Sequence, residues 1–180
     1  MARAGQVIRN PVTGETVTFL VTAEESGGSL MKLELTADPN ARGAPGHVHP
    51  KLTETYEVQT GRLHVRLRGE ERVLEAGERF EFPRGDPHRF WNADDAPATV
   101  VVEFRPAGAF ERFMETVYAL AADGKTNAEG TPKNLLQAAV IANAHLDDIA
   151  LAKWPVWLQR IAFGALAPLG RLFGFRPTYP

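Results

Sequence analysis

The sequence of 180 residues contains no cysteine and almost no surplus of charge of either sign. Without cysteine there is no disulfide framework and no thiolate that could bind a metal. Its 20 Lys and Arg stand against 22 Asp and Glu, giving a formal net charge of −2. The chain therefore has no basic excess, and we expect no nucleic-acid partner.

The sequence also lacks an uninterrupted apolar run of membrane-spanning length. Residues 1–15 have no apolar core after their basic residues, so we expect no secretory signal and a cytoplasmic location. Residues 154–175 are apolar, but Pro155, Arg160 and Pro168 interrupt them too often for a spanning helix. Contact of this segment with a membrane surface is an alternative, and a helix packed on the same chain or on a second subunit is more common.

Histidine is concentrated in two short segments. Residues 46–61 read GHVHPKLTETYEVQTG, and residues 77–92 read GERFEFPRGDPHRFWN. Alternate side chains of a strand share a face, so His47 and His49 point the same way if their segment is extended. Glu54 can return to that face after the bend that follows His49.

His88, on a third stretch, completes a set of three imidazoles and one carboxylate with His47, His49 and Glu54. Such a set is a plausible coordination shell for one divalent transition metal. The alternative is that these histidines are unrelated surface residues. The glycines and the proline at turn positions in both segments favour the metal site.

The two segments resemble the two motifs of the cupin superfamily. The first motif, G-x5-H-x-H-x3,4-E-x6-G, matches from the histidines to Gly61 but has Ala41 where the family has its opening glycine. The second motif, G-x5-P-x-G-x2-H-x3-N, matches at every defined position, namely Gly77, Pro83, Gly85, His88 and Asn92. Because the opening glycine serves a turn, the departure at Ala41 concerns the loop rather than the metal.

The resemblance covers roughly residues 30–105 and implies a mainly β fold, an antiparallel jelly-roll β-barrel with the metal inside. It implies His47, His49, Glu54 and His88 as ligands of one divalent transition metal, which could be Fe, Mn, Ni, Cu, Co or Zn. It does not identify a reaction, because cupins include dioxygenases, isomerases, decarboxylases and binding domains. The nearest functional model is the quercetinase-like dioxygenases.

The rest of the sequence predicts two regions. Short alternating strands with a turn about every ten residues continue to residue 105, so we expect the barrel, with its N-terminal strands, at 1–107. Apolar residues at helical spacing follow, and we expect two or three helices in an extension at 108–180, packed on the barrel or on a partner subunit. These helices are expected at 110–120, from Thr131-Pro132, and at 154–173.

The residues that share the inward parity of the barrel strands are apolar or aromatic, so we expect a small apolar or aromatic, oxygen-bearing substrate. We favour an enzyme with dioxygenase-like or Lewis-acid chemistry over a non-catalytic small-molecule-binding cupin. Glu54, as ligand and base, and Tyr56, as a hydroxyl donor to the substrate, are the candidate catalytic residues; Tyr56 as a plain core residue is the alternative. We expect His145 to be a surface histidine, and the whole chain to form a homodimer.

Overall fold

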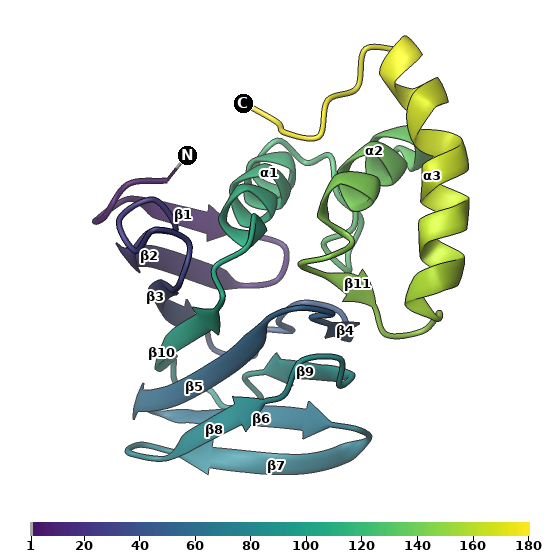
Figure 1. Cartoon of the computed structure of the whole chain (residues 1–180). Helices are drawn as coiled ribbons and strands as arrows, with labels where there is room; N and C mark the ends of the chain where they lie inside the picture. Colours follow the sequence, from purple (N-terminus) through teal and green to yellow (C-terminus); the bar gives the residue numbers. More distant parts are fainter. Residues whose placement is uncertain (1) are drawn as a thin grey trace.

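The computed structural model describes residues 2–180 and contains two antiparallel sheets and three helices (Figure 1). The strands of the first sheet are β1 (Val7–Asn10), β2 (Glu15–Val21), β3 (Met31–Ala37), β10 (Ala98–Arg105), β5 (Thr53–Thr60) and β8 (Arg79–Phe82), hydrogen-bonded in that order. The strands of the second sheet are β11 (Ala150–Leu151), β4 (His47–Val48), β9 (His88–Trp91), β6 (Arg62–Leu67) and β7 (Glu70–Glu75), again in that order.

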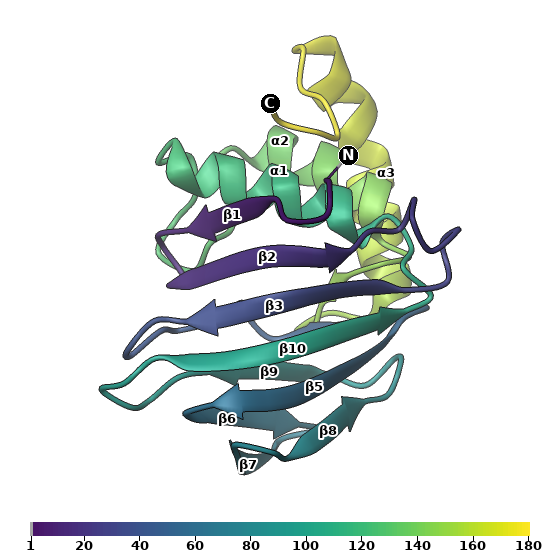
Figure 2. The same ribbon diagram turned by 90° about the vertical axis from the view of Figure 1, so that its left-hand side faces the viewer.

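Buried and less buried residues alternate along the strands of the first sheet, which lie in their hydrogen-bonded order in Figure 2. In β3, Met31, Leu33 and Leu35 are buried, while the residues between them point outward. The register continues this face across the sheet, because Leu33 pairs with Val102 of β10, which pairs in turn with Tyr56 of β5. The inward faces of the two sheets therefore enclose one apolar core.

The three helices are α1 (Phe110–Ala122), α2 (Leu135–His145) and α3 (Val156–Leu172), and they lie together on one side of the sheets (Figure 1). Phe110, Met114 and Tyr118 of α1 are spaced four residues apart, so they share one helix face, and that face is part of the barrel core. The helical segment thus closes one end of the β structure.

Helices α2 and α3 pack closely on each other. A Cβ added at Gly170 would lie 2.6 Å from Cγ2 of Val140 and 2.8 Å from the carbonyl oxygen of Leu136, so only glycine allows this approach. No helix within residues 2–180 is long and apolar enough to cross a membrane.

The predicted fold class is confirmed: the chain is mainly β, with two antiparallel sheets and three C-terminal helices. The predicted start of the second helix at Thr131-Pro132 is wrong. Helix α2 begins at Leu135 because the side chain of Asn134 accepts hydrogen bonds from the backbone N–H groups of Leu136 and Gln137, which caps the helix there.

The division into a barrel at 1–107 and an extension at 108–180 stays a prediction. One strand pairing joins the two regions. Strand β11 belongs to the second region by sequence, yet it pairs with β4, which carries the first motif histidine, His47. Ala150 lies opposite Val48, and Leu151 lies opposite His47. The extension therefore contributes an edge strand to the sheet that carries part of the metal-ligand set.

The loop before β4 takes its shape from Gly43, near the departure from the motif at Ala41. Gly43 has φ +63° and lies where an added Cβ would be 2.2 Å from the carbonyl oxygen of Phe90. Ala41 is buried, and its carbonyl oxygen accepts a hydrogen bond from the backbone N–H of Asn92. A glycine two residues further on thus provides the left-handed conformation.

Candidate metal centre

Four buried side chains from three strands and one turn converge inside the sheets. His47 comes from β4, Glu54 from β5 and His88 from β9, and His49 lies just after β4. Each offers a ligand atom, and these atoms all lie within 4.8 Å of one another. Donors at about 2.0–2.2 Å from one ion are at most about 4.4 Å apart, so a closure of a few tenths of an ångström would suit a single metal.

Strand pairing explains the convergence. His47 of β4 lies directly opposite His88 of β9, and their ring centroids are 4.4 Å apart. His49 follows two residues after His47 on the same face, at 5.0 Å between ring centroids. Glu54 lies opposite Phe104 of β10, one turn of chain after His49, and its carboxylate points at the histidines.

Backbone carbonyl groups orient all three imidazoles. The Nδ1 atoms of His47, His49 and His88 lie 2.9, 2.5 and 2.8 Å from the carbonyl oxygens of Pro45, Asp148 and Asp86, respectively. A carbonyl oxygen can only accept, so each Nδ1 carries the proton and donates it. When the imidazoles are neutral, each Nε2 therefore presents its lone pair to the centre, as ligation of a metal through Nε2 requires.

The centre contains an unsatisfied polar atom that a metal would explain. Nε2 of His49 is buried and has no hydrogen-bond partner, although it lies 3.6 Å from Oε2 of Glu54. Buried polar atoms are nearly always satisfied, so an orphan here is informative. Together with the His₃Glu donor set, this atom shows that the four residues fit one divalent transition metal.

The electrostatics of the centre favour the protonation states of a ligand set. Burial, and then the charges of His88 and His49, lower the pKa of His47 well below its usual value. Burial raises the pKa of Glu54, but the nearby imidazole of His49 and the hydrogen bond with His88 outweigh burial and hold that pKa below its usual range.

His88 competes with a metal for the centre. Burial lowers its pKa, but the 2.9 Å hydrogen bond from Nε2 to Oε2 of Glu54 outweighs burial, so the pKa is raised. A metal would therefore displace a proton that His88 and Glu54 share, and metal affinity should depend on pH.

The C-terminal region supports the centre directly, which the sequence did not reveal. The carbonyl group of Asp148 holds the ring of His49, and its carboxylate accepts from the backbone N–H of Ala109 at the start of α1. Contrary to our expectation of a surface residue, His145 is buried, 3.6 Å from Oδ2 of Asp148. The only sequence signal was the His-x-x-Asp spacing on a helix.

A cavity of about 190 Å³ opens beside the four ligands, between the sheets and the helices. His47, Glu54 and Tyr56 are part of its wall. The remainder is mostly apolar and includes, from both halves of the molecule, Leu33, Leu35, Val102, Phe110, Met114 and Ile141. Among its described lining residues there is no Lys or Arg, so the cavity suits a small, largely apolar ligand.

Tyr56 lies next to the centre, on the same face of β5 as Glu54. Burial, and then the charge of Glu54, raise the pKa of Tyr56 well above its usual value, and its hydroxyl hydrogen-bonds to Glu54. The hydroxyl is therefore a permanent donor. Its edge-on contacts with Phe82 and Phe90 also make it a core residue.

One acidic residue of the cavity was missed from the sequence. Glu15 at the start of β2 is 3% exposed, lines the cavity, accepts a hydrogen bond from the hydroxyl of Thr13 and lies near Tyr118. The sequence signal is its position in the strand, because Glu15, Val17 and Phe19 are alternate residues and all point to the inward face of β2. A carboxylate among the otherwise apolar inward positions of a strand could have been recognised from the sequence.

Comparison with known proteins finds a family match over most of the strands. Residues 33–104 match the family described as Cupin domain. The chain is 36% identical over 114 residues to germin-like protein 3-5 of Oryza sativa subsp. japonica, covering 58% of this chain and 50% of that protein. It is 34% identical over 114 residues to oxalate oxidase 2 of Hordeum vulgare, with the same coverage. The chain spans about half the length of the curated relatives it matches.

Solved structures show a looser likeness. KdgF from Halomonas sp. is 22% identical with a TM-score of 0.48, over 55% of this chain and 84% of that one. An RmlC-like cupin from Shewanella frigidimarina is 21% identical with a TM-score of 0.49, over 59% of this chain and 88% of that one.

Proposed function

We propose that this chain, whose residues 33–104 form a cupin domain around a buried site suited to one metal ion, is a metal-dependent oxidoreductase of small, apolar or aromatic, oxygen-bearing molecules. The observation that carries the proposal is the convergence of His47, His49, Glu54 and His88, two of which, His47 and Glu54, are part of the wall of an apolar cavity. The names of the matched oxalate oxidases support the oxidoreductase class.

Each part of the cavity has a role in this proposal. The four ligands hold a divalent ion, which supplies polarisation of a substrate oxygen and, if it is redox-active, electron exchange with O2. The apolar wall binds the body of the substrate and excludes water. The hydroxyl of Tyr56 would donate a hydrogen bond to a substrate oxygen, and Glu54 would accept a proton.

Dioxygenase chemistry of the quercetinase-like kind is the finer proposal, because an apolar wall suits an aromatic substrate better than a small dianion. Oxalate would place two negative charges in a cavity whose described wall contains no Lys or Arg. The metal ion would offset the charge at one end of oxalate, but the charge at the other end would be desolvated without a Lys or Arg partner, which is costly. We therefore expect oxalate to be a poorer substrate than catechols or diketones.

The test begins with metal analysis of the purified protein, followed by aerobic and anaerobic incubation with catechols, flavonols, diketones and oxalate. We expect O2 uptake that requires Fe, Mn, Ni, Cu or Co and disappears on chelation. Metal affinity should fall as the pH drops towards mildly acid values, because protons compete at the imidazoles. Stoichiometric metal without turnover on any compound would instead support the second class, a non-catalytic binding cupin.

A further inference from the structure

The cavity has a second polar region, formed by Thr13, Glu15 and Tyr118, apart from the metal ligands. Glu15 is the first residue of β2 and points inward with Val17 and Phe19, so its carboxyl group lies among apolar side chains. Burying a carboxyl group costs several kcal/mol unless it is hydrogen-bonded. Its presence in this wall therefore calls for a physical reason.

Glu15 is only partly satisfied by its neighbours. The hydroxyl of Thr13 donates to Oε2 of Glu15, and the hydroxyl of Tyr118 lies close enough to the carboxyl group to lower its pKa. Above its pKa of about 7 the carboxylate is ionised and has about four acceptor sites, so these neighbours leave capacity for a further donor. Both partners line the same cavity, so a ligand in it can approach the carboxylate beside them.

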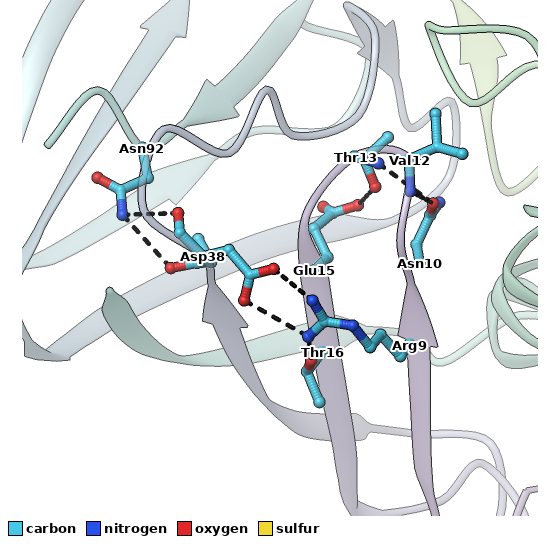
Figure 3. A network of polar contacts seen from close by, with 9 residues as sticks. Arg9, Asn10, Val12, Thr13, Glu15, Thr16, Asp38 and Asn92 are labelled. Atoms are coloured by element: carbon cyan, nitrogen blue, oxygen red, sulfur yellow. Dashed lines mark hydrogen bonds and ion pairs between the residues drawn. The ribbon is translucent and has the colours of Figure 1, made fainter. Parts of the chain in front are cut away.

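The hairpin that carries Glu15 is held rigidly (Figure 3). Oδ1 of Asn10 accepts from the backbone N–H groups of Val12 and Thr13, at 3.0 and 3.2 Å. Arg9 reaches across to Asp38 at 2.6 Å, and the backbone N–H of Asp38 donates to the carbonyl oxygen of Gly14. A group fixed in this way is preorganised for a contact, as binding residues are.

Glu15 is close enough to the metal centre for their charges to interact. Burial first, and also the charge of Glu54, raise the pKa of Glu15 to about 7. The charge of Glu15 in turn adds to the rise in the pKa of Tyr56. One small ligand of about the size of the 190 Å³ cavity would therefore meet both polar regions, with apolar wall between them.

We propose that Glu15, positioned by Thr13 and Tyr118, binds a hydrogen-bond-donating group of the substrate at the end opposite its metal-directed oxygen. The substrate is then a small bifunctional molecule, with an oxygen group for the four ligands, an apolar body, and a hydroxyl or amino group for Glu15. This inference rests on the proposed function and names the class of substrate for the same cavity. In the alternative, Glu15 only holds the hairpin closed.

Binding of matched probes to the zinc-loaded protein tests the inference without turnover. The probes are 4-hydroxybenzoate against 4-methylbenzoate, and 4-hydroxyphenylacetate against 4-methylphenylacetate, measured by calorimetry. Each pair has one carboxylate for the metal and differs only in a hydroxyl or a methyl group of similar size. We expect the hydroxy member of at least one pair to bind about tenfold more tightly, as one hydrogen bond to a charged group allows.

The variants locate the effect. Glu15→Leu should abolish the preference, and Glu15→Gln, which keeps the shape of the side chain, should reduce it if the first variant fails to fold. Glu111→Gln is the matched control: Glu111 is an equally buried carboxylate that accepts from the backbone N–H groups of Ala2 and Ala23, outside the cavity. This control should keep the preference.

Three results would overturn the inference. The first is no binding of any probe, and the second is equal binding of both members of each pair. The third is a hydroxyl preference that survives in Glu15→Leu or, if that variant does not fold, is undiminished in Glu15→Gln. They are distinct from failure of the proposed function. Absence of O2 uptake with every compound would remove the oxidoreductase proposal and leave the binding ratios intact. Turnover without a hydroxyl preference would support the oxidoreductase proposal and overturn the inference about Glu15.

Discussion

At the residue scale, the metal centre depends on the proton that each imidazole carries. Because Nδ1 of His47, His49 and His88 each donates to a backbone carbonyl oxygen, the tautomer is set by the main chain. No side-chain substitution elsewhere can remove those acceptors directly. The ligands themselves are therefore the clean targets for mutation.

His88→Ala and Phe90→Ala should separate binding from stability. Both residues are buried on the inward face of β9, two positions apart. His88→Ala should cut metal occupancy and leave the protein folded, because a core of this size does not depend on the metal. Phe90→Ala should lower the free energy of unfolding by about 3–5 kcal/mol and leave metal content near normal.

Metal analysis and thermal unfolding of the two variants are the measurements. His64→Ala serves as the histidine control, since His64 lies on the outer face of β6 and stacks on Trp91. It should change neither metal content nor fold. A His88→Ala protein that unfolds, with metal retained in the soluble remainder, would mean that His88 is structural.

Glu15→Gln should change how stability depends on pH. Burial raises the pKa of Glu15 from its ordinary 4.5 to about 7, so between these values the folded protein holds a proton that the unfolded chain has released. The free energy of unfolding of the wild type therefore falls as the pH rises through this window and is level above it. At about 1.4 kcal/mol per pKa unit, the total is about 3 kcal/mol.

Glu15→Gln lacks this titration, so its stability relative to the wild type should rise by about 3 kcal/mol from pH 4.5 to pH 8. Urea unfolding at a series of pH values measures it. An unchanged difference across the series would show that Glu15 titrates normally in the folded protein.

Sequence alone could predict the four ligands because strand parity and the motif spacings act locally. It could not predict Asp148 as the acceptor for His49, since the two are 99 positions apart. Glu15 lay within reach of prediction, because its phase on β2 is inward. Its neighbour Tyr118 could not be predicted, because nothing in the sequence of helix α1 indicates which strand end that side chain meets.

At the element scale, the short strand β11 is clamped by one side chain. Gln159 of α3 is fully buried, accepts from the backbone N–H of Leu151, and donates to the carbonyl oxygens of Leu151 and Trp154. Strand β11 pairs in turn with β4. The sequence predicted α3 to within a residue or two, but a two-residue strand has too little pattern to be predicted.

Gln159→Leu should loosen β11 and weaken metal binding. It leaves buried backbone groups without partners, which costs about 1–3 kcal/mol for each group left unsatisfied. Because β11 flanks His47 on β4, the metal dissociation constant should rise several-fold. Metal titration and thermal unfolding are the measurements, with Gln59→Leu, at an exposed site on β5, as the control that should affect neither.

At the scale of the whole molecule, one face of α3 is apolar and exposed. Trp157, Ile161 and Leu172 are 64, 63 and 84% exposed, and Phe173 and Trp154 continue the patch. We propose that this face forms a homodimer with two-fold symmetry, because exposed apolar patches of this kind mark association surfaces. Contact with a membrane surface is the competing proposal.

Light scattering at micromolar concentration should give twice the mass of the chain, and Trp157→Glu should give the monomer. Val7→Glu, at an equally exposed position on the edge strand β1, should leave the dimer intact. A wild-type monomer that sediments with anionic vesicles would contradict the dimer and favour the membrane surface.

The hydrogen bond from His49 to the carbonyl group of Asp148 couples metal binding to the packing of the C-terminal helices. If the ion binds more tightly when that carbonyl is in place, thermodynamic reciprocity requires that the ion hold the helices in place by the same factor. Metal occupancy could then be measured far from the centre, as the resistance of residues 108–180 to a protease. Loss of the metal would then make the chain easier to degrade, starting from its C-terminal helices.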